Sequence, residues 1–506
     1  MEDSRIKEFS EKLSKIKMLP TSDINSETVG SVDLNMLVDQ LILDIGSFDG
    51  FHFVTLEEVT KAMEEMNNAK IPMPVEVIKS SSFKPIAAEY HEKFEIENRD
   101  VEHANGNVTD FVDYFRDRLH KIRRILETHV STDGAPIENL SLLKDMVGRD
   151  VYITGIVSSK ITTKKGNIMV ILEDETDSVR VIFSNSPSEI GKKLYKEASN
   201  IIDDEVIAIK GKIINQFVIA KQIIWPDVII TERKNIEEDL GIAFISDVHV
   251  GSKLFLEQNF ENMVKWLNGG AQDERSRNLA GKIKYLVVAG DVVDGIGVYP
   301  NQDRDLSVPD MYMQYQMFFD LIEDIPDYIH VFVLPGNHDS VRRAEPQPAF
   351  PSSILKDYKR DNIHFVSNPS YIKLNGIQVL AYHGTSLDSI ISSIPGMSYD
   401  KPEYPMLELL KRRHLSPIYG GNVIVPSKVD KLVIDKVPDI MVMGHVHKNA
   451  ISKYKGVTII NSGTWQARTS FQVKYGQMPT PARMPVFEMK NYKVTTVNFS
   501  GDSNVY

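Results

Sequence analysis

Five apolar segments in the second half of the chain each run directly into residues that bind metal ions well. They are GIAFIS before Asp247 and His249, KYLVVAG before Asp291 and Asp294, HVFVLPG before Asn337, His338 and Asp339, QVLAY before His383, and DIMVMG before His445 and His447. Helical stretches separate them, which predicts an α/β domain over residues 240–500. Ligands of such sheets lie beyond the carboxyl ends of the strands, so these polar residues should meet at one rim.

The residue types at this predicted rim are those of a site for two metal ions. Imidazole and carboxylate groups suit Mn, Fe, Zn, Ni or Co, and one carboxylate can bridge two ions. A single such residue after a strand is usually a cap or a surface group, but five strands in series are not explained that way. Two metals ~3.5–4 Å apart clamp the attacking and leaving oxygens of a phosphate during in-line displacement.

Composition excludes several other kinds of protein. The chain has no cysteine, so disulfides, thiol catalysis and cysteine-bound metal sites are ruled out. Its formal net charge of -12 makes it a poor stand-alone binder of nucleic acid, so a local basic groove or a partner subunit would have to supply the attraction. No apolar run or signal peptide predicts a membrane role, and we expect a cytoplasmic location.

The first half of the chain changes character along its length. Residues 1–66 show helical spacing and predict a small helical domain, in which Thr55 and Glu58 form a capping-box pattern. Residues 67–110 are rich in proline, serine and scattered charge, and predict a linker with the composition of a disordered segment. An amphipathic helix opens residues 111–145, and five short strands over residues 146–232 predict an OB-type β-barrel.

The predicted barrel has few aromatic residues for stacking on nucleic-acid bases. They are Tyr152, Phe183, Phe217 and Trp225, and most of them stand where core packing would explain them. We therefore expect the barrel to act as a scaffold or a protein-docking module more than as a binder of single strands.

The order of the motifs DxH, GDxxD, GNHD, H and GHxH resembles that of the calcineurin-like metallophosphoesterases, over about residues 240–465. The resemblance implies a first metal held by Asp247, His249, Asp291 and His447. It implies a second metal held by Asn337, His383, His445 and the shared Asp291. His338 would then steady the transition state and protonate the leaving oxygen, and Asp294 would hydrogen-bond its imidazole.

The sequence around these motifs is similar to that of the small subunits of archaeal family D DNA polymerases. The similarity lies in the upstream barrel and in FISDVHVGS, GDVVDGIGVYPNQ, PGNHDSVRRAEPQPAF and VMGHVHK. It implies a 3′→5′ exonuclease that proofreads for a large polymerising subunit. The substrate would be DNA with a single-stranded or mismatched 3′ end, and the cofactors two divalent metal ions, manganese first among them. A sliding-clamp contact of the N-terminal helices stays open.

Basic residues near the motifs are candidates for binding DNA phosphates. Arg342 and Arg343 follow the GNHD turn, and Lys411–His414 form a second basic cluster. The excursions at residues 295–312 and 388–428 would be a lid or a partner surface.

Two other functions stay in play. One is a metallophosphatase or cyclic-nucleotide phosphodiesterase with a small substrate, although Gly295 and Asp339 replace the Arg and Glu of the protein phosphatases in this family. The barrel and linker argue against a small-molecule enzyme. The other is a non-catalytic assembly subunit, against which the complete ligand set speaks.

Overall fold

The computed structural model describes residues 2–14, 18–29, 34, 37–38, 41, 52–70, 83–101, 104–128, 139–271, 273–355 and 358–501. The chain forms two compact units, residues 1–82 and 83–506. Among the described residues, no helix is long and apolar enough to cross a membrane.

The first unit packs short helices around a small parallel sheet. Its elements are α1 (Glu2–Ser14), β1 (Met18–Pro20), α2 (Ser26–Val29), β2 (His52–Val54) and α4 (Leu56–Lys70). Phe9, Leu13 and Val59 lie in its core. The predicted capping box opens α4: the backbone N–H of Thr55 donates to Glu58 (2.7 Å), and the Glu58 N–H donates to Thr55 Oγ1 (3.3 Å).

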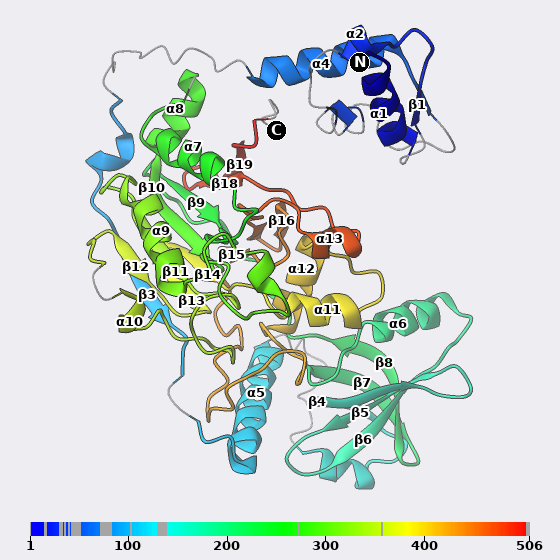
Figure 1. Ribbon diagram of the computed structural model, residues 1–506. Coiled ribbons are helices and arrows are strands. Elements are labelled where there is room, and N and C mark those ends of the chain that lie inside the picture. Colours follow the sequence, from blue (N-terminus) through cyan, green and yellow to red (C-terminus); the bar gives the residue numbers. More distant parts are fainter. Residues whose placement is uncertain are drawn as a thin grey trace. The chain divides into compact units, whose positions relative to one another are not determined.

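The second unit is built on two six-stranded sheets that face each other (Figure 1). The first has the order β12-β11-β10-β9-β18-β19, made of β9 (Gly241–Ile245), β10 (Ile283–Ala289), β11 (His330–Leu334), β12 (Ile363–Phe365), β18 (Arg483–Glu488) and β19 (Lys493–Asn498). The second has the order β16-β17-β15-β14-β13-β3, made of β3 (Phe94–Asn98), β13 (Ser370–Leu374), β14 (Ile377–Ala381), β15 (Ile440–Met443), β16 (Ala450–Tyr454) and β17 (Val457–Asn461). The predicted α/β domain is confirmed, and the strands that precede the predicted metal ligands are parallel within each sheet.

Helices cover the outer faces of this sandwich. The helices on the first sheet are α7 (Glu257–Leu267), α8 (Glu274–Gly281) and α9 (Met311–Glu323), and those on the second are α11 (Leu387–Ser393) and α12 (Glu403–Arg412). Shorter helices are η1 (Ile86–Glu89), η3 (Gln302–Arg304), α10 (Ser352–Leu355) and α13 (Ser470–Lys474). Since α11 and α12 bury Ile390, Met406 and Leu409, these two helices of the 388–428 excursion pack on the core of the second sheet and do not form a lid.

The linker prediction for residues 67–110 is wrong for several segments: α4 extends to Lys70, η1 and a strand lie within the range, and the helix Val108–Thr128 begins inside it. Phe94–Asn98 forms β3, which pairs antiparallel with β13 at the edge of the second sheet. The side chain of Phe94 packs against Phe332, with ring centroids 5.3 Å apart. Four of the five β3 residues are exposed at this edge. Phe94 and Ile96 do alternate with Glu95 and Glu97, but so short an alternation within a polar stretch is a weak signal for a strand. Residues 71–82 and 102–103 of the predicted linker lie outside the described part of the chain.

The predicted five-strand barrel is confirmed. It closes in the order β4-β5-β6-β8-β7, with β4 (Asp150–Thr162), β5 (Ile168–Glu173), β6 (Ser178–Phe183), β7 (Val206–Ile214) and β8 (Phe217–Ile224). The helix α6 (Glu189–Ser199) follows the third strand, and η2 (Leu140–Asp145) precedes the first. Tyr152, Phe183 and Trp225 are buried, as their expected packing role requires.

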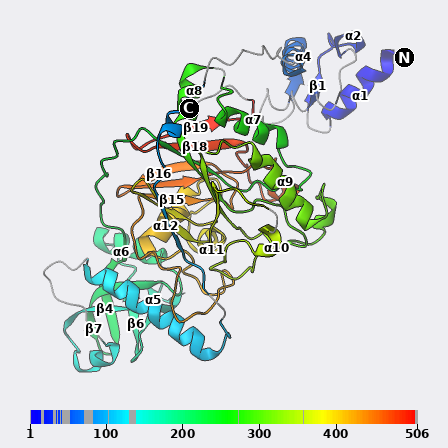
Figure 2. The ribbon, with the colours of Figure 1, turned by 90° about the vertical axis from the view of Figure 1, so that its left-hand side faces the viewer.

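The helix α5 (Val108–Thr128) lies along the barrel, as Figure 2 shows, and joins it to the sandwich. The buried guanidinium of Arg118 donates to Asp430 (2.9 Å) and to the carbonyl oxygens of Pro417 and Asp204. His414 Nε2 lies 2.8 Å from the same Asp430 carboxylate. Burial opposes the charge of Asp430, but His414 and Arg118 outweigh it and lower the pKa of this carboxyl.

The basic cluster Lys411–His414 is structural, which corrects its expected role in binding DNA. Arg412 is buried and pairs with Glu205 of the barrel at 2.7 Å and with Glu408. Arg413 donates to the carbonyl oxygens of Ile434 and Asp435. Lys411 lies over the Trp225 ring, 3.8 Å from its centroid. Arg412 and Lys411 thus hold the barrel against the sandwich, and Arg413 binds main-chain carbonyls within the sandwich. These side chains are used in structural contacts and are not free to contact phosphate.

Removal of the buried Arg118 guanidinium on α5 should lower the free energy of unfolding much more than removal of an exposed guanidinium on the same helix. We expect Arg118→Met to lower the free energy of unfolding by about 3–5 kcal/mol, because Asp430 is left buried with one partner fewer. The control Arg116→Met, on the same helix with a side chain 45% exposed, should cost about 0–1 kcal/mol. Urea unfolding of both variants measures the difference, and equal costs would contradict the role given to Arg118.

Candidate metal centre

The structure brings the seven predicted metal ligands together at one rim of the sandwich. Asp247 and His249 follow β9, Asp291 follows β10, Asn337 follows β11, His383 follows β14, and His445 and His447 follow β15. These strands belong to both sheets, so the rim joins the two halves of the domain. The convergence follows from parallel strands that end at the same edge. That these residues bind metal stays a prediction.

One half of the centre is formed by two carboxylates and two imidazoles. His249 Nε2 and His447 Nε2 lie 3.0 Å apart. Asp247 Oδ1 lies 3.4 Å from His447 Nε2 and 3.9 Å from His249 Nε2. Asp291 Oδ2 lies 3.9 Å from His249 Nε2. Four potential ligand atoms therefore face a common point, as the first predicted metal requires.

The other half shares Asp291. Asn337 Oδ1 lies 3.0 Å from His383 Nε2 and 3.1 Å from His445 Nδ1. Asp291 Oδ2 lies 3.3 Å from His383 Nε2, so the same oxygen faces both groups of ligands. This is the position of a bridging carboxylate.

The outer nitrogens of three histidines fix the inner ones as ligand atoms. His249 Nδ1 lies 3.1 Å from Asp294 Oδ1, His383 Nδ1 lies 2.8 Å from the carbonyl oxygen of Ala289, and His445 Nε2 lies 3.0 Å from Asp388 Oδ2. Each outer nitrogen faces an acceptor and so carries a proton. The inner nitrogen then keeps its lone pair for a cation, which is the usual support of metal-binding histidines. The residues present therefore fit a divalent metal.

Backbone strain is concentrated at this rim. Five of the predicted ligands adopt positive φ angles between 50° and 69°: Asp247, His249, Asp291, His445 and His447. Non-glycine residues rarely adopt this conformation, because it strains the backbone. Such strained residues occur mostly at functional sites. Two glycines at this rim leave space for the side chains of predicted ligands. A Cβ on Gly336 would lie 2.2 Å from Asp291 Oδ1, and one on Gly290, at φ 88°, would lie 2.5 Å from His383 Nδ1.

The buried carboxylates give the centre a field that favours cations. Burial lowers the pKa of His383, but the charges of Asp291 and Asp247 outweigh it and raise that pKa to about 10. The pKa of Asp291 is lowered in turn, since His383 and His338 outweigh its burial. The same carboxylates would attract a divalent cation, which would take the place of the extra proton and leave His383 Nε2 free to bind it.

His338 stands beside the predicted ligands. Its ring centroid is 4.7 Å from that of His249, and its Nδ1 lies 2.7 Å from the main-chain carbonyl oxygen of Asp294. The expectation that Asp294 orients this imidazole is thus met by the backbone and not by the carboxylate. The Asp294 carboxylate faces His249 and accepts from Gln302 Nε2 (2.9 Å).

Three further residues contact the predicted ligands or their loops. Asp388 and Gln472 were not predicted from the sequence, and Asp339 was expected at the rim but without a role. Asp388 accepts from His445. The Gln472 amide nitrogen donates to His447 Nδ1 (3.0 Å) and so holds that ring with the opposite polarity, from a donor and not from an acceptor. The carboxylate of Asp339 accepts from the backbone N–H of Gly336 (2.8 Å) and of Val292 (3.3 Å), and so ties two ligand loops together. Burial, and then the charge of Asp291, raise the pKa of Asp339 to about 7. Asp339 was marked in the sequence by its place in GNHD, whereas no motif marked Asp388 or Gln472 for these contacts.

The two arginines after the GNHD turn differ in exposure. Arg342 donates to the carbonyl oxygens of Val101 (2.7 Å) and Pro346 (2.8 Å), so its guanidinium is used to hold loops together. This argues against its predicted contact with DNA phosphate. Arg343 is exposed, and its nearest acceptors, Gly297 and Val298, lie at 3.4–3.5 Å. Only Arg343 keeps the predicted role.

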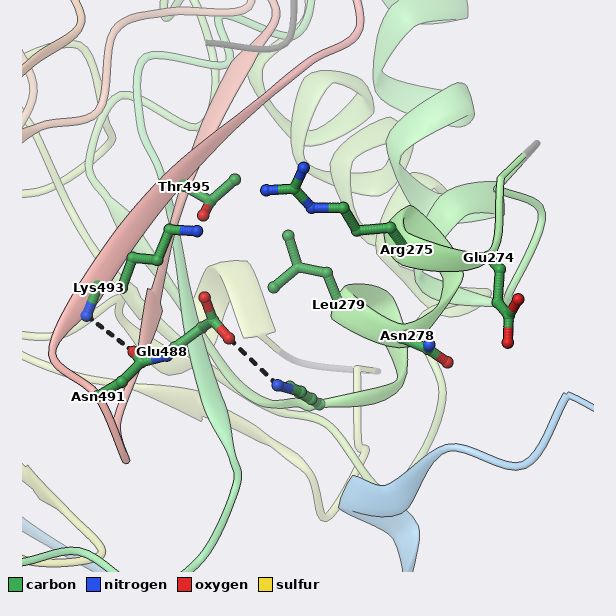
Figure 3. Close-up of a pocket in the computed structure, with 9 residues that line it drawn as sticks. Glu274, Arg275, Asn278, Leu279, Glu488, Asn491, Lys493 and Thr495 are labelled. Carbon is green, nitrogen blue, oxygen red and sulfur yellow. Dashed lines mark hydrogen bonds and ion pairs between the residues drawn. The ribbon is translucent and has the colours of Figure 1, made fainter.

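A separate polar pocket of about 450 Å³ lies where α8 meets β18 and β19 (Figure 3). Lys282 within it pairs with Glu488 at 3.1 Å and with Asp239 at 3.0 Å. None of the predicted ligands lines it. The pocket therefore belongs to the edge of the first sheet and not to the metal centre.

The family of B subunits of the DNA polymerases alpha and epsilon matches residues 242–452, which include all seven predicted ligands. The class that this match indicates is the B subunit of a DNA polymerase.

Similar proteins narrow the class. The DNA polymerase II small subunit of Archaeoglobus fulgidus is 43% identical over 76% of this chain and 75% of its own. That of Methanothermobacter thermautotrophicus is 40% identical over 88% and 90%, and that of Pyrococcus horikoshii 35% over 95% and 81%. The chain belongs to the small subunits of archaeal family D DNA polymerase, which carry this name.

Loss of a supporting carboxylate should weaken metal binding. We expect Asp388→Asn to lower Mn²⁺ affinity about 10–100-fold, because His445 loses the acceptor that orients its ring. Asp320→Asn, an exposed aspartate on α9, serves as the control and should leave affinity unchanged. Isothermal titration calorimetry measures both, and unchanged affinity of Asp388→Asn would refute the support of His445.

Proposed function

We propose that this chain is a 3′→5′ exonuclease that proofreads for the large polymerising subunit of its polymerase. Its substrate is DNA with a single-stranded or mismatched 3′ end. It uses two divalent metal ions, manganese first among the candidates. The proposal rests on the completeness of the ligand cluster, in which one oxygen of Asp291 faces two groups of ligands.

The chemistry assigned to the centre divides between cofactor and protein. Two divalent ions bound there would supply an activated water and neutralise phosphate charge. Asp247, Asp291, Asn337 and the four histidines would position those ions. His338 Nδ1–H donates to the carbonyl oxygen of Asp294, which orients the ring. In its imidazolium form the ring would carry a second proton, on Nε2, and would give that proton to the departing 3′ oxygen. Arg343 would contact a phosphate of the incoming strand.

Family membership supports the partner part of the proposal. A small subunit implies a large one, and the relatives share this name. The acidic chain is a weak stand-alone binder of DNA, so the large subunit would deliver the 3′ end to the centre. Contact with a sliding clamp stays a prediction.

The activity is tested with the assembled two-subunit complex. We expect it to release mononucleotides from 3′-mismatched DNA in Mn²⁺ and to stop when a chelator removes the metal. A variant in which Asp291 is replaced by Asn provides the matched control. Release that persists in this variant would point to a contaminating nuclease. Failure of the intact complex to release any nucleotide, with metal bound, would favour an assembly subunit and refute the proposal.

His338 separates the chemistry from metal binding. We expect His338→Asn to lower the cleavage rate about 10²–10⁴-fold, the usual worth of a positioned acid, while the Mn²⁺ content stays that of the wild type. Single-turnover kinetics and metal analysis measure the two effects. The exposed His91→Asn is the control and should change neither. If His338→Asn lost its metal as well, His338 would be a ligand and its assigned role would be wrong.

A further inference from the structure

Apolar side chains are exposed on and beside the short helix α13. Phe471 and Tyr475 are each 61% exposed, Val473 is 56% exposed and Met478 is 54% exposed. The rings of Phe471 and Tyr475 lie together, with centroids 4.6 Å apart. We call these four residues the aromatic ledge. A group of solvent-exposed apolar side chains often marks a surface that binds a ligand or another macromolecule.

The ledge is continuous with the metal centre. Gln472 lies between two ledge residues and turns inward, where its amide nitrogen is 3.0 Å from His447 Nδ1. The backbone N–H of Thr480 donates to the carbonyl oxygen of His447 (2.9 Å), and Lys448 Nζ donates to that of Met478 (2.9 Å). The ledge therefore flanks the loop that carries a predicted ligand. A DNA strand whose 3′ end reaches the metal centre has to cross the protein surface beside that centre.

The charge around the ledge is unusual for this acidic chain. No aspartate or glutamate lies between Asp439 and Glu488, although six lysines and arginines do. Two of them, Arg468 and Lys474, are exposed next to the ledge. Exposed rings with basic neighbours are the surface that single-stranded nucleic acid prefers, because bases stack on the rings while the cations attract phosphates.

We propose that the aromatic ledge stacks the bases at the 3′ end of single-stranded DNA, and so seats the strand whose terminal phosphodiester enters the metal centre. This inference rests on the proposed exonuclease function and names the subsite that holds its substrate. Phe471 and Tyr475 supply the stacking faces, whereas Val473 and Met478 extend the apolar surface. The ledge would select bases that are not stacked in a duplex. It would not select a sequence, since every base offers a flat face.

The test combines a change in the protein with a change in the DNA. A fluorescent single strand and the same strand with abasic sites at its 3′ end are titrated with the full chain, with Ca²⁺ present to suppress cleavage. We expect the double variant Phe471→Leu, Tyr475→Leu to bind the normal strand about 10–100-fold more weakly than the wild type does. The abasic strand should bind equally to both. Phe471→Trp and Tyr475→Trp should keep the affinity, because they keep a stacking face.

Controls separate the ledge from general effects. Tyr312→Leu, a tyrosine 64% exposed on α9, should bind both strands as the wild type does. The leucine variants should keep the circular dichroism spectrum and Mn²⁺ content of the wild type. Equal binding of the normal strand by wild type and double variant, or an equal loss with both strands, would overturn the proposal. Loss of assembly with the large subunit in place of the DNA effect would make the ledge a protein-docking surface, which also overturns it.

The outcome is distinguishable from the fate of the exonuclease proposal. Binding that depends on both the rings and the bases, together with no nucleotide release in Mn²⁺, would refute the exonuclease and leave the ledge in place. Nucleotide release, together with binding that depends on neither the rings nor the bases, would support the exonuclease and refute the role of the ledge.

Discussion

The carboxylate of Asp291, buried where the two sheets meet, is the constraint on which the centre depends. A buried carboxylate without compensating charge costs several kcal/mol, so its surroundings have to supply cations or N–H donors. Its Oδ1 accepts from the backbone N–H of His338 (2.8 Å), and its Oδ2 faces His383 and His249. Gly336 leaves room for it, because any Cβ there would overlap with the carboxylate. The ligand loops of both sheets are thereby held in register around one negative group.

The composition of the centre follows from local sequence, because strand period and the residue after each strand can be read directly. Asp247, Asn337 and His445 were predicted in this way, and the parallel strands that precede them explain their convergence. Details that depend on the fold could not be predicted. Five of the predicted ligands, all Asp or His, have positive φ angles, which these residue types tolerate but which only the tight loops of the fold require. Gln472 reaches His447 from a helix 25 residues away, with no motif to mark it.

Contacts between segments distant in sequence explain the two main corrections. Arg118 and Asp430 are 312 residues apart, so their pairing, and the burial of Arg412 and His414 beside it, is invisible to composition. A basic run that reads as a phosphate-binding patch therefore joins the barrel to the sandwich. The strand β3 was missed for the same reason, since its partner β13 lies some 270 residues further along the chain. Arg342 was misread because its acceptor at Val101 is equally remote.

The central claim is that the seven side chains hold two cations with Asp291 between them. Anomalous X-ray scattering from crystals of the full chain grown with Mn²⁺ tests it most directly. The account predicts two manganese peaks, about 3.5–4 Å apart, with an oxygen of Asp291 shared between them. A single peak, or peaks at other side chains while these seven stay without metal, would contradict it.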